Sequence, residues 1–254
     1  MQPLKTINLL NTDIHSVTEA EVVDLVEQAI DAEEPVRIGV VNAAKLVNMQ
    51  SDPLLADDVK SSDLVLADGM SVVWASKMLG QGLPERVAGC DLMYRFFELA
   101  NRRQWRVYCL GATEEISARV EENLKKEYPN LTLAGRRNGY FSTEEEAEIA
   151  AQIAAAKPHF LLVAMTSPKK ENFMGAWGET MNVPIVHGVG GSFDVYAGLV
   201  ERAPESWQKL GLEWLYRVKQ EPGRLWKRYL ITNTKFAWLI MKEAVQHLFG
   251  SQKK

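Results

Sequence analysis

The stretch "LVLADGMSVVWASKML" (Leu64–Leu79) joins a short apolar run, an Asp-Gly step and a second run with helical spacing. This order predicts a β-strand, a turn and an α-helix, the repeating unit of an open α/β sheet. Asp68 falls at the turn and has two interpretations. It is either an N-cap of the following helix, a position that Asp prefers, or a general base beyond the carboxyl end of a strand, where ligands of such sheets bind.

The same alternation of strand-like and helical patterns continues over the first 200 residues. The expected strands are Val36–Val41, Leu64–Leu66, Arg106–Leu110, Leu131–Ala134, His159–Met165 and Pro184–Val189. Capping boxes that begin at Ser16 and Thr143 indicate the starts of two helices, and Ile116, Val120 and Leu124 mark one face of a third. We therefore predict that residues 1–200 form a Rossmann-like α/β domain, with a parallel sheet flanked by helices.

From about residue 201 the pattern becomes entirely helical, with a break at Pro222-Gly223. Residues 201–254 hold 11 Lys and Arg against 5 Glu, and four of the seven tryptophans, although the whole chain has a net charge of −4. This composition predicts a helical C-terminal appendage. Its basic and aromatic side chains favour contact with an anionic membrane surface. The alternative is a helical subdomain that packs its Trp residues against the body of the protein.

Several functional classes lack support in the sequence. Two cysteines cannot build a disulfide framework, and Cys109 lies in an apolar run that predicts burial. The N-terminus does not resemble a signal peptide, and no apolar stretch approaches the ~20 residues that cross a bilayer, so we expect a cytoplasmic protein. GxGxxG, GxxxxGK[ST] and HExxH motifs are missing, and the histidines are dispersed. We therefore predict no cofactor and no metal site, and nucleic-acid binding is disfavoured by the acidic body.

Small and polar residues follow nearly every expected strand, where a parallel sheet brings them to one rim. They are Asn42, Asp68, Gly69, Gly111, Thr113, Thr166, Ser167, Lys169, Lys170, Gly190, Gly191, Ser192 and Asp194. We expect substrate contacts from Gly111, Thr166, Lys170, Gly190, Gly191 and Asp194. Simpler interpretations stay open, because Asn42 and Thr113 suit helix caps and a glycine cluster suits a tight turn.

Three longer blocks carry a family resemblance: "LADGMSVVWASKMLGQGLPERVAGCDL" from residue 66, "RRNGYF" from residue 136, and "GVGGSFDVYAGLVERAPESWQKLGLEWLYRVKQEPGRLWKRYL" from residue 188. Together they resemble the WecG/TagA/CpsF bacterial glycosyltransferases, glycosyltransferase family 26, over roughly Asn42 to Phe236. The resemblance implies the GT-E fold, which is Rossmann-like.

This resemblance also implies an activity. Family members transfer a hexosyl unit from a UDP-sugar to an undecaprenyl-diphosphate-linked sugar at the cytoplasmic membrane face, with inversion and without an essential metal. Implied partners are thus the donor, the lipid-linked acceptor and the anionic inner leaflet, while homo-oligomerisation stays open. A noncatalytic polysaccharide-assembly scaffold is one alternative. A Rossmann-type oxidoreductase is another, but it would need the dinucleotide turn that this chain lacks.

The resemblance assigns roles to individual residues. Asp68 matches the proposed catalytic base, Asn42 a sugar-pocket residue and Arg86 a polar site position. The basic residues that match those closing over the nucleotide diphosphate are Arg217, Arg224 and either Lys227 or Arg228. Guanidinium groups can stabilise a departing diphosphate where no metal is present. For Arg217 and Arg224, attraction to lipid alone is the alternative.

Two positions depart from the family pattern. Many relatives end the first strand in Thr-x-Asn, whereas this chain has Val40-Val41-Asn42 and lacks the hydroxyl. A glutamine of the family's G-x-P-K-Q-E block is replaced by Lys170, a cation that could pair with the diphosphate or with a uronic acid donor. The sequence therefore predicts the reaction class and leaves open which sugar is transferred: N-acetylmannosamine, a glucosyl unit or a uronic acid.

Overall fold

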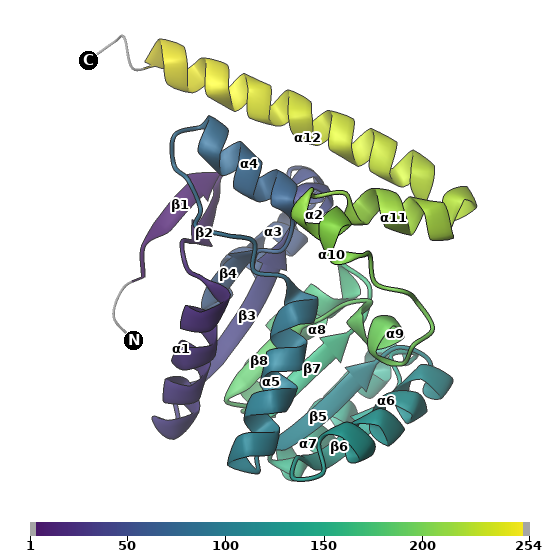
Figure 1. The fold of residues 1–254 in the computed structure, drawn as a ribbon. Helices are drawn as coiled ribbons and strands as arrows, with labels where there is room; N and C mark the ends of the chain where they lie inside the picture. The colour runs from purple at the N-terminus through teal and green to yellow at the C-terminus, as the bar shows by residue number, and fades with distance from the viewer. Residues whose placement is uncertain (1–3, 251–254) are drawn as a thin grey trace.

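The computed structural model describes residues 4–250, without the side chains of Arg224 and of residues 247–250. Within this range a six-stranded parallel sheet has the order β4-β3-β8-β7-β5-β6 (Figure 1). The strands are β3 (Val36–Val41), β4 (Leu64–Ala67), β5 (Arg106–Gly111), β6 (Thr132–Arg137), β7 (Phe160–Ala164) and β8 (Ile185–Gly188). All six expected strands are confirmed, and so is the Rossmann-like α/β class.

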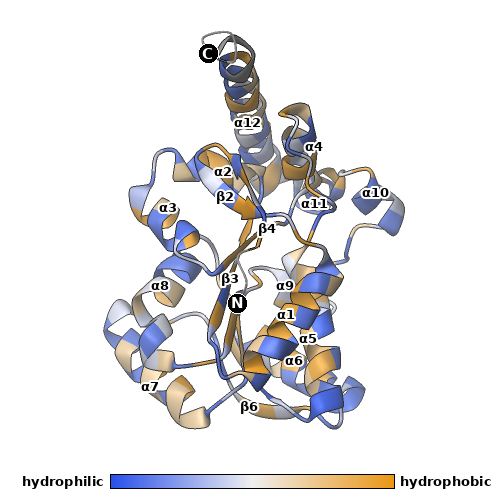
Figure 2. Cartoon of the chain, turned by 90° about the vertical axis from the view of Figure 1, so that its left-hand side faces the viewer, coloured by the Kyte–Doolittle hydropathy of each residue, from blue (hydrophilic) through white to orange (hydrophobic). Residues whose placement is uncertain are grey.

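Helices cover both faces of the sheet (Figure 2). One face carries α1 (Glu19–Asp31), α5 (Gly89–Arg103), α6 (Glu114–Glu127) and α9 (Ser192–Tyr196), and the other carries α2 (Ala43–Met49), α3 (Pro53–Lys60), α7 (Glu146–Ala156) and α8 (Lys169–Met181). The short α4 (Met70–Met78) follows β4. Alternate residues of β5 enter different cores, since Cys109 packs on the α5 side and Leu110 on the α7 side. Cys109 is buried, as predicted.

An N-terminal hairpin was not predicted. β1 (Thr6–Leu9) and β2 (Thr12–His15) pair antiparallel through a two-residue turn in which Leu10 and Asn11 have φ angles of 50° and 58°. Such left-handed turns match the twist of paired strands. Each strand has only four residues, and Leu rather than Gly or Asn begins the turn, so the sequence carries little hairpin signal.

Two predicted helix starts are displaced. The capping box expected at Ser16 lies at Thr18 with Glu21, and the one expected at Thr143 lies at Ser142 with Glu145, ahead of the 3₁₀ turn η1 (Thr143–Glu145). Both observed pairs fit the same S/T-x-x-E spacing as the predicted ones. Spacing alone could not choose between them.

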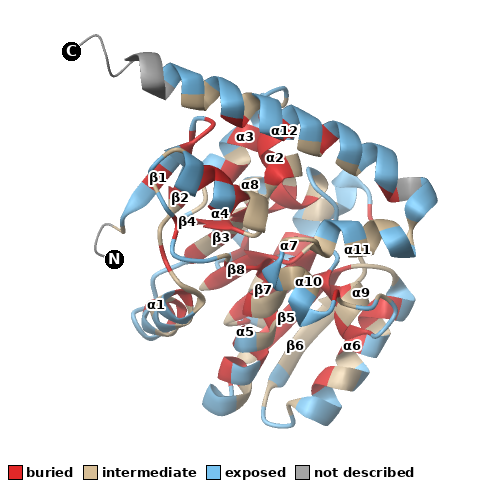
Figure 3. Cartoon of the chain, turned by 45° about the horizontal axis from the view of Figure 1, so that its top comes forward, coloured by how far each residue is buried: buried red, intermediate tan, exposed pale blue. Residues whose placement is uncertain are grey.

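The C-terminal segment forms α10 (Glu205–Lys209), α11 (Glu213–Gln220) and α12 (Pro222–Gly250). The predicted break is confirmed, because Pro222 begins α12, a position that tolerates its missing N–H. α12 lies across α2 and is buried along that contact, where Phe236 and Ile240 join the core of Leu46 (Figure 3). No helix in the described part of the chain combines the length and apolar character needed to span a bilayer.

Candidate active site

The expected polar rim includes the carboxyl ends of β3 and β8. These strands are neighbours, yet the chain leaves β3 for α2 on one face and leaves β8 for α9 on the other. Such a topological switch point is the usual ligand site of an open α/β sheet. Asn42 follows β3, Asp68 follows the adjacent β4, and Gly190 and Gly191 follow β8.

Asp68 does not cap the helix that follows it. The N-cap of α4 is Gly69, which offers no side-chain bond. Instead, Oδ1 of Asp68 accepts a hydrogen bond of 2.9 Å from the backbone N–H of Gly89, the first residue of α5. The carboxylate therefore lies at a helix N-terminus, where negative charge is favoured. The interpretation as a cap of α4 is wrong, and the general-base role stays a prediction.

Asn42 is a helix cap, one of the two interpretations that the sequence left open. Its Oδ1 accepts a hydrogen bond of 3.0 Å from the backbone N–H of Lys45 at the start of α2. A Cβ on Gly69 would lie 3.4 Å from Cβ of Asn42, so the turn at Asp68 packs directly against the Asn42 cap. The two strand ends thus form one continuous wall of the rim. A contact of Asn42 with a sugar stays a prediction.

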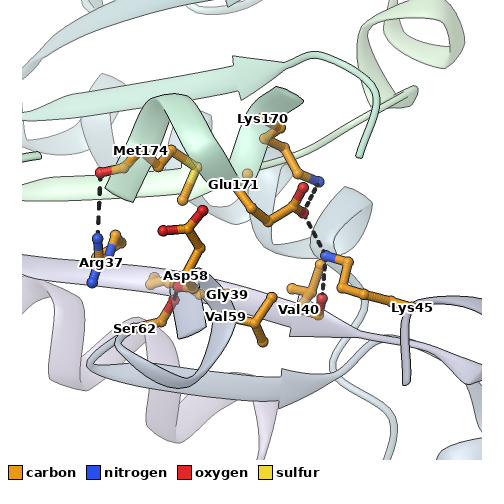
Figure 4. A pocket seen from close by; sticks show the side chains of 12 residues that line it. Arg37, Gly39, Val40, Lys45, Asp58, Val59, Ser62, Lys170, Glu171 and Met174 are labelled. Atoms are coloured by element: carbon orange, nitrogen blue, oxygen red, sulfur yellow. Dashed lines mark hydrogen bonds and ion pairs between the residues drawn. The ribbon is translucent and has the colours of Figure 1, made fainter. Parts of the chain in front are cut away.

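A buried trio of charges lies beneath this rim (Figure 4). Nζ of Lys45 donates to Oε1 of Glu171 at 2.7 Å and to the carbonyl of Val40 at 2.6 Å. Nζ of Lys170 lies 3.4 Å from the same carboxylate oxygen. The two ammonium groups overcome the effect of burial and lower the pKa of Glu171 to about 2, while burial and the nearby Lys45 lower the pKa of Lys170 to about 8. Sequence reasoning missed Lys45 and Glu171, because charged residues on helices normally face solvent.

The side chain of Lys170 lies against the end of β8 and the turn that follows it, Gly190-Gly191 (the β8 turn). A Cβ on Gly188 would lie 2.8 Å from its Cδ, and one on Gly190 would lie 3.7 Å from its Nζ. The residue is 6% exposed, and the cavity beside it has a volume of about 10 Å³, too small for a sugar. Lys170 thus supports the floor of the rim, and a direct contact with the donor stays a prediction.

We expect Lys170→Met to raise the melting temperature at pH 7. Since the pKa of Lys170 falls from 10.5 to about 8 on folding, the folded protein is penalised for this charge below pH 8. Between pH 8 and 10.5 the unfolded chain holds more protons, so wild-type stability rises with pH and the gain from Lys170→Met shrinks. Thermal denaturation across pH 6–11 measures this.

Lys45→Met is the matched comparison. It removes the closer partner of Glu171 and should lower the melting temperature, since a buried carboxylate then loses its shortest ion pair. If Lys170→Met also lowers the melting temperature at pH 7, its ion pair with Glu171 outweighs the cost of burying its charge.

Arg217 reaches the rim from the C-terminal segment. Its Nη1 lies 3.9 Å from the position that a Cβ on Gly191 would occupy, and Oδ2 of Asp194 lies 3.8 Å from the same point. Gly190 has a φ of 56°, a left-handed conformation that favours glycine. The β8 turn, α9 and α11 therefore bring a guanidinium group beside a glycine turn.

The ends of β5 and β7 extend the rim. Gly111 pairs with Ala164, has a φ of 130°, and passes so close to β7 that a Cβ would lie 2.3 Å from the carbonyl oxygen of Ala164. Thr166 follows two residues after Ala164 and is exposed. Thr113 caps α6 through its side chain, the simpler of its two interpretations. Gly111 and Thr166 thus lie on the expected rim, and their contacts with substrate stay predictions.

The other predicted basic residues differ in their surroundings. The guanidinium of Arg86 bonds the side chains of Glu213, Asp91 and Gln208. Arg228 is exposed on α12, 5.1 Å from the ring of Tyr229, and Lys227 is exposed as well. The side chain of Arg224 lies outside the described residues. The donor roles of these residues stay predictions, as does the choice between Lys227 and Arg228.

Metal-binding groups are not assembled in the described range, where no three His, Cys, Asp or Glu side chains lie close enough together to hold an ion. Positive charge near the rim comes from Arg217 and from Lys170 beneath it. An anion such as a diphosphate at the rim would therefore meet the guanidinium of Arg217 and the backbone N–H groups of the Gly190-Gly191 turn.

Comparison with known proteins identifies the family. The profile described as "Glycosyl transferase WecG/TagA/CpsF family" matches residues 7–249. An N-acetylglucosaminyldiphosphoundecaprenol N-acetyl-beta-D-mannosaminyltransferase of Bacillus spizizenii (strain ATCC 23059 / NRRL B-14472 / W23) is 34% identical over 199 residues, 77% of this chain and 76% of the relative. The enzyme of the same name from Bacillus subtilis (strain 168) is 35% identical over 187 residues, 74% of this chain and 72% of the relative. The resemblance noted in the sequence is confirmed: this chain belongs to the WecG/TagA/CpsF family of glycosyltransferases.

Proposed function

We propose that this protein transfers an N-acetylmannosaminyl unit from its UDP derivative to N-acetylglucosaminyl-diphosphoundecaprenol, with inversion at the anomeric carbon. The names of the two Bacillus relatives support this donor and acceptor. The observation that carries the proposal is that the carboxyl edge of the sheet bears both a carboxylate and a guanidinium: Asp68 follows β4, and Arg217 lies beside the Gly190-Gly191 turn that follows β8. Lys170 is buried against Glu171, which argues against a dedicated partner for a uronic acid donor.

In the proposed reaction, Asp68 accepts the proton of the acceptor hydroxyl while the hydroxyl oxygen bonds to the anomeric carbon. The bond between that carbon and the UDP oxygen breaks on the opposite face, so the configuration inverts. UDP departs with additional negative charge, which Arg217 and the N–H groups of the Gly190-Gly191 turn stabilise. Every proton and electron pair is accounted for without another reactant.

The donor is tested by incubating the protein with a panel of UDP-hexoses, UDP-N-acetylhexosamines and UDP-uronic acids, each with and without the lipid-linked acceptor. UDP release should require the acceptor and be fastest with UDP-N-acetylmannosamine, and it should persist in excess EDTA. If UDP is released only from a different UDP-sugar, that sugar replaces N-acetylmannosamine as the proposed donor unit. Lipid binding without any UDP release would favour the scaffold alternative.

The outward face of α12 supports membrane contact. Figure 3 shows that much of α12 is exposed. Exposed apolar residues recur along it at intervals of three or four or their multiples: Trp226, Leu230, Trp238, Met241 and Val245. Basic residues flank this stripe, namely Lys227, Arg228, Lys235 and Lys242. Glu243 faces inward, where its carboxylate accepts from the backbone N–H of Leu10. This pattern is typical of helices that lie in the interface of an anionic leaflet, and we propose that α12 docks the rim on the inner leaflet of the plasma membrane.

Reversing two charges on α12 should weaken this docking. Lys235→Glu/Lys242→Glu is expected to reduce the affinity for anionic vesicles by on the order of tenfold or more at low salt, since each basic side chain near the surface contributes about 1 kcal/mol. Vesicle co-sedimentation measures it. The matched control, Lys125→Glu/Lys126→Glu on α6, alters net charge equally at exposed positions away from α12. If both variants lose the same affinity for anionic vesicles, the proposal that α12 docks on the membrane is wrong.

A further inference from the structure

Four charged residues from three segments of the chain meet where the C-terminal helices join the body. Nη1 of Arg86 lies 2.7 Å from Oε2 of Glu213, and Nη2 of Arg86 lies 3.3 Å from Oδ2 of Asp91. The other oxygen of Asp91 pairs with Nη2 of Arg202. These side chains are only 13–27% exposed, so their interactions are shielded in part from water.

This cluster connects two of the three sequence blocks that carry the family resemblance, those that begin at residues 66 and 188. Arg86 and Asp91 come from "PERVAGCDL", Arg202 from "ERAP" and Glu213 from "GLEWLYR". Glu213 is also the first residue of α11, and Arg217 lies four residues later on the same side of that helix. The cluster therefore holds the start of the helix that presents Arg217 to the Gly190-Gly191 turn.

α11 needs such an anchor. It has eight residues, none of them fully buried, and no side chain caps its N-terminus. A helix this short has little stability of its own in water. Its other polar contacts lead to the same connecting segment, since Tyr216 donates to the carboxylate of Glu201 and Gln220 donates to the carbonyl of Glu201. Glu213, by contrast, bonds Arg86 on the body of the protein.

We propose that Glu213 is a positioning residue that acts through Arg217. By pairing with Arg86, which Asp91 and Arg202 hold in place, it fixes α11 so that Arg217 faces the diphosphate of the donor. The role rests on the proposed function for its substrate. The positioning role goes beyond that function, because it predicts that the effect of Glu213 on turnover depends on Arg217, although Glu213 itself does not contact the substrate.

A double-mutant cycle tests this dependence. Glu213→Gln keeps the shape of the side chain and removes its charge, and it should reduce turnover on the order of tenfold in the wild-type background. In the Arg217→Ala background the same change should cost less than about twofold, because the group that it positions is already missing. Glu205→Gln is the control, since it removes an exposed ion pair with Lys209 on the adjacent α10 and should leave turnover unchanged.

Hydrogen exchange provides a readout that needs no donor. Backbone amides of residues 215–220 should exchange faster in Glu213→Gln than in the wild type or in Glu205→Gln. Equal losses of turnover in both backgrounds, or unchanged exchange in α11, would overturn the positioning role. If the wild type releases no UDP at all, the proposed function fails and the catalytic part of this role fails with it, whereas the exchange result still decides whether Glu213 anchors α11.

Discussion

Asp68→Asn is expected to reduce turnover by ~10²–10⁴-fold, the range associated with loss of a general base, with little change in UDP-sugar affinity. Asparagine can still accept the hydrogen bond that Gly89 N–H donates to Oδ1, so the turn should keep its geometry. What it loses is the ability to take up a proton. Steady-state kinetics with the lipid-linked acceptor, together with UDP-sugar titration, separate the two effects.

Asp52→Asn provides the matched control. Asp52 caps α3 by accepting a hydrogen bond of 3.0 Å from the backbone N–H of Leu55, so the same chemical change is made at an aspartate with a purely local role. Its turnover should equal that of the wild type. Near-normal turnover of Asp68→Asn would reduce Asp68 to a cap of α5 and remove it from the chemistry.

The second large effect is expected for Arg217→Ala, which should lower turnover by about 10²-fold, as does loss of a group that stabilises developing charge in a transition state. Arg217 is the guanidinium that lies at the Gly191 turn. Vesicle binding should change little, because Arg217 is one cation among the many of the C-terminal segment. Turnover and co-sedimentation are measured on the same preparations.

Lys219→Ala is the control for this variant. Lys219 is exposed and lies two residues after Arg217, on another side of α11. Its substitution therefore removes the same charge from the same helix. It should leave turnover unchanged. If the two variants lose turnover equally, or if Arg217→Ala loses vesicle binding in proportion to turnover, then Arg217 acts through lipid attraction alone.

The sheet could be predicted because its strands are buried on both faces. Residues of β7, for example, are all buried, so the strand appears as an uninterrupted apolar run. The edge strand β6 was harder to delimit, since it continues through Arg136 and Arg137, which pair with glutamates at the surface. The N-terminal hairpin was not predicted from the sequence, because it is stabilised by contacts with α2, β4 and α12, which are remote in sequence.

The rim could also be predicted, because strand ends of a parallel sheet must converge. The ion pairs around the rim could not be predicted, because they join residues far apart in the chain. Lys45 meets Glu171 across 126 residues, and Arg86 meets Glu213 across 127. No local sequence pattern predicts either ion pair. The division of the chain into residues 1–200 and 201–254 stays a proposal, since Phe236 and Ile240 of α12 share a core with the body.

The central claim is that Asp68 enables transfer of one N-acetylmannosaminyl unit to a lipid-linked N-acetylglucosamine diphosphate. Mass spectrometry of the lipid product, with UDP quantified in the same reaction, tests it most directly. We predict that the wild type adds the mass of one N-acetylhexosamine residue to each acceptor and releases one UDP for each product, and that Asp68→Asn does so at least ~10²-fold more slowly. An unchanged acceptor mass with UDP-N-acetylmannosamine, or product formed by Asp68→Asn at the wild-type rate, would contradict it.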